Sequence, residues 1–483
     1  MNTVGIALLQ AFETKPLFGF VLPNHISSAP RWQQNSAARS KLKIPSMNQS
    51  VSPAKSLNGT VVLPGDKSIS HRYGMLAGIA QGVTTVHNYS TGADCQSTLA
   101  CMQALGAVIE RQSEGNEGKA AKILIHGNPL RQPAAQLDAG NSGSTIRMLS
   151  GILAGQTFTS RIGGDESLSA RPMDRVIQPL TQMGAAIEGS EIAGRKGNFP
   201  PLTIHGQRLH GIDYTPPMAS AQVKSCVLFA GLFAEGATIV REPIQTRDHS
   251  EIALRDFGAD IEITPRTVTL QGGTTLTGRE LMVPGDLSSA AFFLVAALLI
   301  GDADLIIRNV GLNPTRTALL DFLSSIGASI KIIDVKQSGG ELIGDLRVRG
   351  NKNGVKGGVI EGALTAALID EIPALSVLGA VSENGLTVRN AGELRVKETD
   401  RIATIETNMR RMGIQIETTP DGFYIPGRQK FHAAEIDPAG DHRIAMAFAV
   451  AALAADAPST ITNAECAGVS FPEFFATLGA IAR

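Results

Sequence analysis

Six segments of the chain repeat one pattern, and no other feature of the sequence restricts the possible folds as strongly. Each segment begins with a polar or Gly/Pro-containing turn, continues as an apolar stretch rich in Ala and Leu, and ends with a Gly-bearing turn and a short β-branched run. The segments are 63–88, 137–160, 217–240, 283–309, 369–390 and 436–463, so successive starts lie 66 to 86 residues apart. A solenoid repeat is shorter than this, whereas such an interval holds two helix-and-strand units, as in a βαβαββ subdomain.

Four of the gaps between these segments hold a second apolar stretch that ends with Gly and leads into a strand-like run. These stretches are LTQMGAAIEG, LRDFGADIEI, LSSIGASIKI and MRRMGIQIET, at 180–189, 254–263, 323–332 and 409–418. A Gly just beyond the last helical residue is a common signal for the end of a helix. The sequence therefore predicts an α/β fold of six βαβαββ subdomains, most simply arranged as two sets of three.

The fourth segment echoes the first, since LPGDKS at 63–68 recurs as VPGDLS at 283–288. We therefore expect a first α/β domain over 66–284 and a second made of 47–65 plus 285–483, each with three subdomains. A short strand at 57–63 is expected to pair with the second half. The Pro-Gly turns at 64–66 and 283–286 are expected to act as hinges where the chain crosses between the domains.

Residues 1–46 differ from the rest of the chain, with Glu13 as their one acidic residue against five Lys or Arg. We expect a disordered extension or, as the alternative, a transit-like leader, because organellar leaders are basic and poor in acidic residues. Over the whole chain 43 Lys and Arg face 44 Asp and Glu. This balance gives no long-range attraction to nucleic acid or to an anionic membrane, so we expect neither partner. The longest apolar runs, 290–301 and 444–455, are too short to span a bilayer and are expected to be buried helices.

Unusual polar residues gather where the repeated apolar stretches begin. A helix N-terminus offers free N–H groups and a partial positive charge, so several helix starts at one interface make an anion site. The candidates at these starts are Lys67, Ser68, Arg72, Asn141, Gly143, Ser144, Arg147, Ser220, Gln222, Lys224, Asp370, Glu371 and Arg443, with Arg171, Thr246, Arg247, Arg395, Lys397, Glu398 and Arg401 downstream. Because a solvated face would not favour helix starts over helix middles, the pattern predicts a multiply anionic ligand between two domains.

Each of these residues also has an ordinary interpretation when it is taken alone. Asp370 could simply cap the apolar helix that follows it. Arg147 could have a packing role. Arg395, Lys397 and Arg401 alternate with acidic residues, so they could form a surface ion-pair network of little energetic weight.

The ordered motifs DKSISHR, GNSGSTIR, SARPM, SAQVK, TRDH, DEIP, RVKETDR and GDHRIAM resemble those of the 5-enolpyruvylshikimate-3-phosphate synthase family, from about residue 56 to the C-terminus. The resemblance implies a two-domain inverse α/β barrel, the enolpyruvyl transferase fold, with a two-stranded hinge. It also implies that the 5-hydroxyl of shikimate 3-phosphate adds to phosphoenolpyruvate and that the tetrahedral intermediate then loses phosphate, in chorismate and aromatic amino acid biosynthesis. No metal or organic cofactor is implied. We expect a cytoplasmic monomer, or an organellar protein if residues 1–46 are a transit peptide.

The same resemblance assigns ligand contacts and proton transfers to individual residues. The expected contacts of shikimate 3-phosphate are Lys67, Ser68, Arg72, Ser220, Gln222, Thr246, Arg247, Asp370 and Lys397. The expected contacts of phosphoenolpyruvate are Lys67, Asn141, Gly143, Arg171, Gln222, Arg401 and Arg443. Asp370 is expected to be the general base, with Lys67 and Glu398 as proton donors or acceptors. A planar guanidinium binds phosphate and carboxylate through paired N–H groups, which suits the three arginines to a ligand that carries both.

The sequence departs from the family pattern in ways that point to one of its branches. GNSGSTIRM lacks the final Pro of the better-known branch, and Val469 stands where many members carry a Lys near the phosphate. With SARPM, SAQVK, TRDH and NPTRT, these differences make the chain resemble the second class, some of whose members tolerate glyphosate. Tolerant enzymes often carry Ala at the position of Gly143, so we expect glyphosate to inhibit this protein.

Two other functions are alternatives to this expectation. The first is transfer of enolpyruvate to UDP-N-acetylglucosamine, but the enzymes that do so typically carry a Lys-Asn pair where this chain has Lys67 and Ser68, and a reactive loop Cys. The second is a phosphate-binding module without catalysis. Joint retention of Lys67, Asp370 and Glu398 argues against it, because binding alone needs no carboxylate beside an anion.

Overall fold

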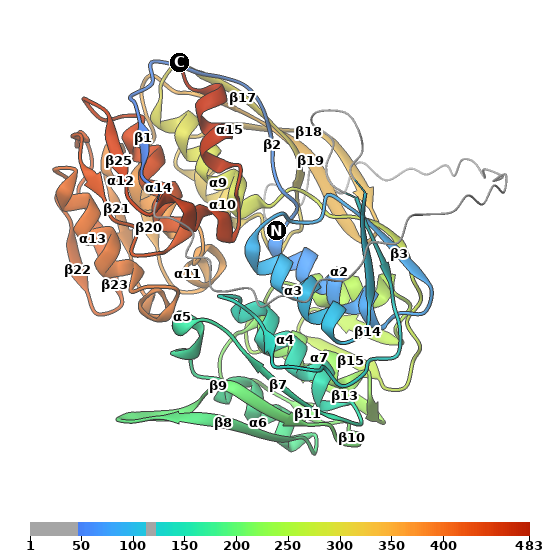
Figure 1. Cartoon of the computed structure of the whole chain (residues 1–483). Coiled ribbons are helices and arrows are strands. Elements are labelled where there is room, and N and C mark those ends of the chain that lie inside the picture. The colour runs from blue at the N-terminus through green and yellow to red at the C-terminus, as the bar shows by residue number, and fades with distance from the viewer. Residues whose placement is uncertain (1–46, 113–121) are drawn as a thin grey trace.

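The apolar residues that the structure describes form two separate cores. The structure is a computed structural model, and it describes residues 47–112 and 122–483; the extension predicted for residues 1–46 lies outside them. One core draws on residues from Ile69 to Val283, and we call this part lobe 1. The other core combines residues 51–63 with Leu287–Ile481, and we call it lobe 2. In Figure 1 the blue strands of the N-terminal segment run among the yellow and red elements of lobe 2.

Among the described residues, the strands form six main sheets that share one order. In each, the first strand pairs parallel with the second, and the second pairs antiparallel with the third. The sheets of lobe 1 are β16 (Glu280–Met282)-β3 (Val83–His87)-β5 (Lys122–His126)-β4 (Val108–Gln112), β6 (Leu137–Asp138)-β7 (Thr159–Gly163)-β9 (Arg195–His205)-β8 (Ala186–Ile192), and β11 (Asp213–Tyr214)-β13 (Ala237–Arg241)-β15 (Thr267–Gln271)-β14 (Ile261–Thr264). Those of lobe 2 are β2 (Leu57–Val62)-β17 (Ala303–Gly311)-β19 (Glu341–Arg349)-β18 (Ser329–Ser338), β20 (Gly358–Ile360)-β21 (Leu386–Val388)-β23 (Gly422–Ile425)-β22 (Glu417–Thr419), and β24 (Glu435–Ile436)-β25 (Ser459–Ile461)-β1 (Gln49–Val51).

Three of these strands join a sheet whose other strands lie far away in the sequence. The predicted pairing of the strand near 57–63 with the second half is confirmed, since β2 pairs parallel with β17. Strand β1 pairs antiparallel with β25, close to the C-terminus. Strand β16 returns from the end of lobe 1 to pair with β3. Each lobe is therefore closed by a strand from a distant part of the chain.

The chain crosses between the lobes at two neighbouring Pro-Gly turns. The backbone N–H of Asp66 donates to the carbonyl of Pro284 over 2.7 Å, and that of Asp286 donates to the carbonyl of Pro64 over 3.2 Å. A Cβ at Gly65 would lie 1.8 Å from the carbonyl oxygen of Asn88, so only glycine fits the first crossing. The two crossings thus form one antiparallel connection.

The repeated apolar stretches form the buried helices α2 (Lys67–Ile79), α4 (Gly143–Ala154), α7 (Ala221–Gly231), α9 (Leu287–Leu299), α12 (Ile372–Val381) and α14 (His442–Ala452). The apolar runs at 290–301 and 444–455 lie largely in α9 and α14, as predicted. Five of these helices begin after an Asp or Ser whose side chain accepts a backbone N–H of the first turn: Asp66, Ser142, Ser220, Asp286 and Asp441. Within residues 47–112 and 122–483, no helix is long and apolar enough to cross a membrane.

A second set of helices covers the sheets: α3 (Ala93–Ala104), α6 (Asp174–Gln182), α8 (His249–Asp256), α10 (Ala318–Ser325) and α13 (Arg401–Arg411). The four predicted helix ends are confirmed, since Gly184, Gly258, Gly327 and Gly413 all follow a helix and have positive φ. The backbone N–H after Gly184 donates back to the carbonyl of Leu180, the usual closure of such an end. The remaining elements are α5 (Glu166–Ser169), α11 (Ala363–Leu368), α15 (Phe474–Ile481), the 3₁₀ turns η1 (Gly392–Val396) and η2 (Ala464–Val469), and the pair β10 (Leu209–His210) and β12 (Ala234–Glu235).

Candidate active site

The six buried helices all contribute residues near their N-termini to one cavity of about 400 Å³. Lobe 1 supplies the starts of α2, α4 and α7, and lobe 2 supplies those of α9, α12 and α14. The loop from 244 to 247 in lobe 1 and the segment from Glu393 to Arg401 in lobe 2 complete the wall. The cavity therefore combines both lobes with the free N–H groups and positive ends of helices.

Most residues that the sequence singled out line this cavity. They are Lys67, Ser68, Gly143, Ser144, Arg147, Arg171, Ser220, Gln222, Thr246, Arg247, Asp370, Lys397, Glu398, Arg401 and Arg443. Nine cationic side chains and five carboxylates are among the lining residues, so the wall carries a clear positive excess. Charges that face each other at about 4 Å interact by about 4 kcal/mol at an effective dielectric near 20. Such a wall favours a ligand with several negative charges.

Two expected contact residues do not reach the wall. Arg72 turns into lobe 1, where Nε donates to Ser250 Oγ and Nη2 donates to Ser225 Oγ, each over 2.7 Å. Its Nη1 donates to the carbonyl of Ser68, also over 2.7 Å. Asn141 lies behind the wall and accepts a hydrogen bond from Arg171 Nη2 over 3.0 Å. In this structure Asn141 therefore orients Arg171, while Arg72 supports the start of α2.

Asp370, in the turn before α12, is the carboxylate with the most cations around it. Its oxygens lie 2.7 Å from Arg247 Nη2, 3.7 Å from Arg401 Nη1, 3.9 Å from Lys397 Nζ and 4.0 Å from Arg443 Nη2. Burial acts to raise the pKa of Asp370, but these cations, with Arg443 the strongest, hold it well below its usual range. Asp370 is therefore an ionised acceptor at neutral pH. An anionic ligand that neutralises the same cations would make it a stronger base.

Lys67, the first residue of α2, faces the cavity beside Asp94 of α3. Its Nζ lies 3.1 Å from Asp94 Oδ2, and the two side chains are mostly buried. Burial favours the neutral amine, but Asp94 and the more distant Glu398 raise the pKa of Lys67 above its ordinary value. Lys67 is therefore protonated and can donate a proton. No motif in the sequence pointed to Asp94, which lies in the first turn of α3.

Glu398 and Arg401 form a buried ion pair at the lobe 2 side of the cavity. Arg401 Nη2 lies 2.6 Å from Glu398 Oε2, and Arg401 Nε lies 2.7 Å from Asp441 Oδ2, the cap of α14. Burial acts to raise the pKa of Glu398, but Arg401 is the strongest of several cations that hold it well below its usual range. Arg401 is 1% exposed, and its Nη1 has no hydrogen-bond partner among the described residues. That N–H group is available to a ligand.

Gly143 begins α4 where two guanidinium groups come close to the backbone. A Cβ at this position would lie 2.8 Å from Arg147 Nη1 and 3.5 Å from Arg171 Nη1. Arg147 Nη1 also donates to Gln222 Oε1 over 2.8 Å. The missing side chain thus leaves room for Arg147 to hold Gln222 in the wall.

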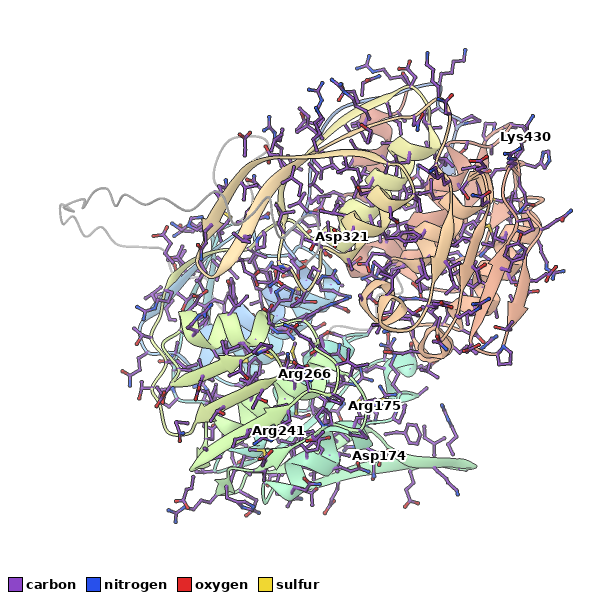
Figure 2. All side chains as sticks on the ribbon, turned by 180° about the vertical axis from the view of Figure 1, so that it is seen from behind. Asp174, Arg175, Arg241, Arg266, Asp321 and Lys430 are labelled. Atoms are coloured by element: carbon purple, nitrogen blue, oxygen red, sulfur yellow. The ribbon has the colours of Figure 1, made fainter. Side chains whose placement is uncertain are left out.

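The structure adds two cations that sequence reasoning did not assign. Arg316 lines the cavity from lobe 2, where Nη2 lies 3.3 Å from Glu371 Oε1 and also donates to Ser288 Oγ. Arg316 belongs to the motif NPTRT, which at the sequence level indicated a branch of the family but no ligand contact. Arg175 lines the cavity from the first turn of α6, and Figure 2 labels its place on lobe 1.

Three residues singled out at the sequence level lie outside the wall. Lys224 is buried in lobe 1 between two carboxylates. Glu371 lies behind the wall beside Arg316. Arg395 pairs with Asp400 over 2.8 Å, in the manner of the surface ion-pair network considered for this segment.

No group of three or more His, Cys, Asp or Glu side chains is placed to hold a metal ion in the described ranges, 47–112 and 122–483. All four cysteines are free thiols, three of them buried and Cys466 partly so. The lining of the cavity presents ammonium, guanidinium, carboxylate, amide and hydroxyl groups.

Comparisons with known proteins agree on one family. Residues 51–478 match the family model described as EPSP synthase (3-phosphoshikimate 1-carboxyvinyltransferase). The 3-phosphoshikimate 1-carboxyvinyltransferase of Solibacter usitatus (strain Ellin6076) is 61% identical over 440 residues, which are 90% of this chain and 100% of that protein. The protein of the same name from Koribacter versatilis (strain Ellin345) is 50% identical over 433 residues, 89% of this chain and 98% of that one.

Solved structures give the same result for the fold. The EPSP synthase from Acinetobacter baumannii superposes with a TM-score of 0.78 at 40% sequence identity, over 90% of this chain and 98% of that chain. The enolpyruvyl transferase NikO from Streptomyces tendae superposes with a TM-score of 0.72 over the same shares, but at 17% identity. The second likeness concerns the fold alone.

Proposed function

This chain belongs to the EPSP synthase (3-phosphoshikimate 1-carboxyvinyltransferase) family, and from that membership we infer that the cavity between the lobes holds shikimate 3-phosphate beside phosphoenolpyruvate. The expected enolpyruvyl transferase fold is confirmed. As a member of the family, the protein transfers the enolpyruvyl group of phosphoenolpyruvate to the 5-hydroxyl of shikimate 3-phosphate and releases inorganic phosphate. This reaction belongs to the shikimate pathway of aromatic biosynthesis.

The observation that carries the assignment of residues is the ionised carboxylate of Asp370 among four cations, at the meeting point of six helix starts. Around it we place shikimate 3-phosphate against Lys67, Ser68, Ser220, Gln222, Thr246, Arg247, Asp370 and Lys397, with Arg72 behind Ser68. We place phosphoenolpyruvate against Lys67, Gly143, Arg171, Gln222, Arg401 and Arg443, with Asn141 holding Arg171. The cations offset the mutual repulsion of the two anionic substrates.

The proton transfers follow from the charges of three side chains. In the addition step Asp370 accepts the proton of the 5-hydroxyl as its oxygen bonds to C2 of phosphoenolpyruvate, and protonated Lys67 donates to the C3 methylene. In the elimination step the Glu398 carboxylate accepts a proton from the resulting methyl group while the bond from C2 to the phosphate oxygen breaks. Well-placed acids and bases contribute about 10²- to 10⁴-fold each. We thus propose that Lys67 is the proton donor and Glu398 the proton acceptor, a division of roles that the sequence left open.

The structure already holds Asp370 of lobe 2 within 2.7 Å of Arg247 of lobe 1. Movement about the two chain crossings would let the substrates enter, and closure over them would expel water from the tetrahedral intermediate. We also expect a monomer in the cytoplasm, bound neither to nucleic acid nor to membrane. Sedimentation equilibrium of the purified full-length protein tests whether it is a monomer, since the mass obtained for a monomer should be near 50.7 kDa.

The test is phosphate release by the purified protein with phosphoenolpyruvate plus shikimate 3-phosphate, beside a reaction in which UDP-N-acetylglucosamine replaces the latter. We expect release only with shikimate 3-phosphate. Asp370→Asn should lower kcat by at least about 100-fold, because the amide keeps the shape but cannot accept the proton. The matched control is Asp400→Asn, outside the cavity, which keeps its cap on α13 and should stay within about threefold of the parent. Release with UDP-N-acetylglucosamine, or equal loss in both variants, would contradict the assignment.

A further inference from the structure

Four charged side chains lie inside lobe 1, behind the wall of the cavity. Arg72, Lys224, Glu242 and Glu251 are each at most 7% exposed. Lys224, two residues after Gln222 on α7, places its Nζ 2.8 Å from Glu242 Oε2 and 2.6 Å from Glu251 Oε1. A buried ion pair repays its desolvation poorly, and apolar residues of similar volume are often as stable. The stability of the fold alone therefore explains poorly why the Lys224 ammonium is buried between two carboxylates.

Glu242 connects the buried ammonium to the cavity. It directly follows β13, and its second oxygen, Oε1, accepts the backbone N–H of Thr246 over 3.1 Å and also the Thr246 hydroxyl. Thr246 and Arg247 line the cavity from a segment with no regular structure. Arg247 in turn reaches across to Asp370 of lobe 2 over 2.7 Å. A continuous set of polar contacts thus runs from Lys224 to the proposed general base.

We propose that Lys224 is a positioning residue: by fixing one oxygen of Glu242, it makes the other oxygen hold Thr246 and Arg247 in the cavity wall, and so sets the affinity for shikimate 3-phosphate. The proposal rests on the proposed function, because it takes shikimate 3-phosphate as the ligand of this wall. Lys224 itself touches no substrate. The segment with Thr246 and Arg247 does not contact phosphoenolpyruvate in the proposed arrangement. That substrate lies instead against Gly143, Arg171, Arg401 and Arg443.

The two carboxylates on the same ammonium provide a matched pair of variants. Glu242 uses both of its oxygens, one for Lys224 and one for Thr246. Glu251 uses one oxygen for Lys224, and its other oxygen has no hydrogen-bond partner among the described residues. A glutamine has a single oxygen. Glu242→Gln must therefore give up one of two contacts, whereas Glu251→Gln can keep its only one, although both remove the same charge from the same buried site.

The experiment measures melting temperature, kcat and the KM for each substrate in the full-length parent, Glu242→Gln, Glu251→Gln and Lys224→Met. We expect both glutamine variants to melt lower than the parent. Glu242→Gln and Lys224→Met should raise the KM for shikimate 3-phosphate about tenfold, with the KM for phosphoenolpyruvate and kcat within about threefold of the parent. Glu251→Gln should leave all three kinetic values within about twofold.

Lys224→Met combined with Glu242→Gln should raise the KM for shikimate 3-phosphate no further than either change alone, because both disrupt the same contacts from Lys224 through Glu242 to Thr246. Equal KM values for shikimate 3-phosphate in the two glutamine variants would overturn the proposal, because Lys224, Glu242 and Glu251 would then have a purely structural role. If Glu242→Gln does not fold, Glu242→Asp replaces it: the charge is kept but the reach to Thr246 is shortened, so an unchanged KM would equally overturn the proposal. Failure of the proposed function is separate, since it would show as no phosphate release by the parent.

Discussion

The proton affinity of Asp370 depends on the four cations around it. In the proposed function the same cations also bind the substrates. In the structure its four cations keep the carboxylate ionised. In the proposed function the phosphate and carboxylate groups of the ligands would take up part of that positive charge, so we expect Asp370 to become a stronger base as each anion binds and strongest when both are bound. Proton abstraction would then be favoured when both substrates are present.

Gly143 leaves space for two guanidinium groups on the side of the cavity that we assign to phosphoenolpyruvate. In Gly143→Ala the new Cβ would press on Arg147 Nη1, which lies 2.8 Å away, and crowd Arg171. We expect the KM for phosphoenolpyruvate to rise about tenfold, and we expect glyphosate to inhibit this variant more weakly than the parent. Steady-state kinetics with glyphosate at limiting phosphoenolpyruvate measure both. Gly468→Ala is the control, because its Cβ would meet no atom within 4 Å; an unchanged KM in Gly143→Ala would contradict the prediction.

Asp66 and Asp286 cap α2 and α9 at the two chain crossings. Their surroundings shift the pKa values of the two carboxyl groups in opposite directions. Burial and the neighbouring Asp66 raise the pKa of Asp286 to about 6. Burial also acts to raise the pKa of Asp66, but His249 and Arg316 hold it below its ordinary value. Ionised Asp286 therefore costs stability above pH 6, and the cost disappears as the pH falls toward 4. Ionised Asp66 instead contributes stability at neutral pH.

Asp286→Asn keeps a good cap and removes the buried charge. We expect this variant to be more stable than the parent at pH 7.5, by at most about 3 kcal/mol, and the difference to shrink toward pH 4.5. Asp66→Asn should do the reverse and melt lower than the parent at pH 7.5. Melting temperatures at the two pH values test both, and a pH-independent difference for Asp286→Asn would refute the argument.

At the residue scale the sequence indicated which positions carry the chemistry but not which way each side chain turns. Gln222 and Lys224 lie two positions apart on α7, about 200° around the helix, so one faces the cavity and the other the interior. Arg72 lies one turn beyond Ser68 and therefore deeper in lobe 1. Helix geometry could have separated these residues. Asp94 could not have been found this way, because its place beside Lys67 depends on how α3 packs against α2.

At the scale of elements, local patterns predicted the buried helices and the Gly-terminated helix ends, because both depend on neighbours in the sequence. The strand that completes each lobe is different. Strands β1 and β16 are three residues each, and nothing in QSV or ELM indicates their partners β25 and β3. Only β2 was expected to pair with the second half, through the likeness of LPGDKS to VPGDLS. Long-range pairing is set by the assembled lobe.

Truncation at the N-terminus should separate the role of β1 from that of the residues before it. A protein that begins at Met47 keeps β1 and the pairs from Gln49 with Ile461 to Val51 with Ser459. We expect it to retain kcat within about twofold and its melting temperature within about 2 °C. A protein that begins at Ser56 exposes the edge of β25 and should melt at least about 5 °C lower. Equal melting of the two would show that β1 adds nothing to lobe 2.

At the scale of the whole molecule, two cores joined by two crossings predict two units of unfolding. We expect the lobes to act as the domains 66–284 and 47–65 plus 285–483. Calorimetry of the ligand-free protein should then resolve two transitions. Shikimate 3-phosphate at about 100 times its Kd should add about 2.7 kcal/mol to the free energy of unfolding. It should raise the temperatures of both transitions, because we expect it to contact both lobes. A single two-state transition without ligand, or a shift of only one transition with it, would contradict this arrangement.

The pairing of β1 with β25 also has a consequence for how the protein is made. Gln49 meets Ile461, which leaves the ribosome about 410 residues later. At about 5 to 20 residues per second, the first strand of the newly made chain waits roughly 20 to 80 seconds for its partner. Lobe 1 is complete by Met282 and can fold during that wait, while β2 waits for β17 and β1 waits longer still, for β25. The interval in which β1 could pair wrongly is therefore set by the speed of translation of the roughly 410 residues that follow it.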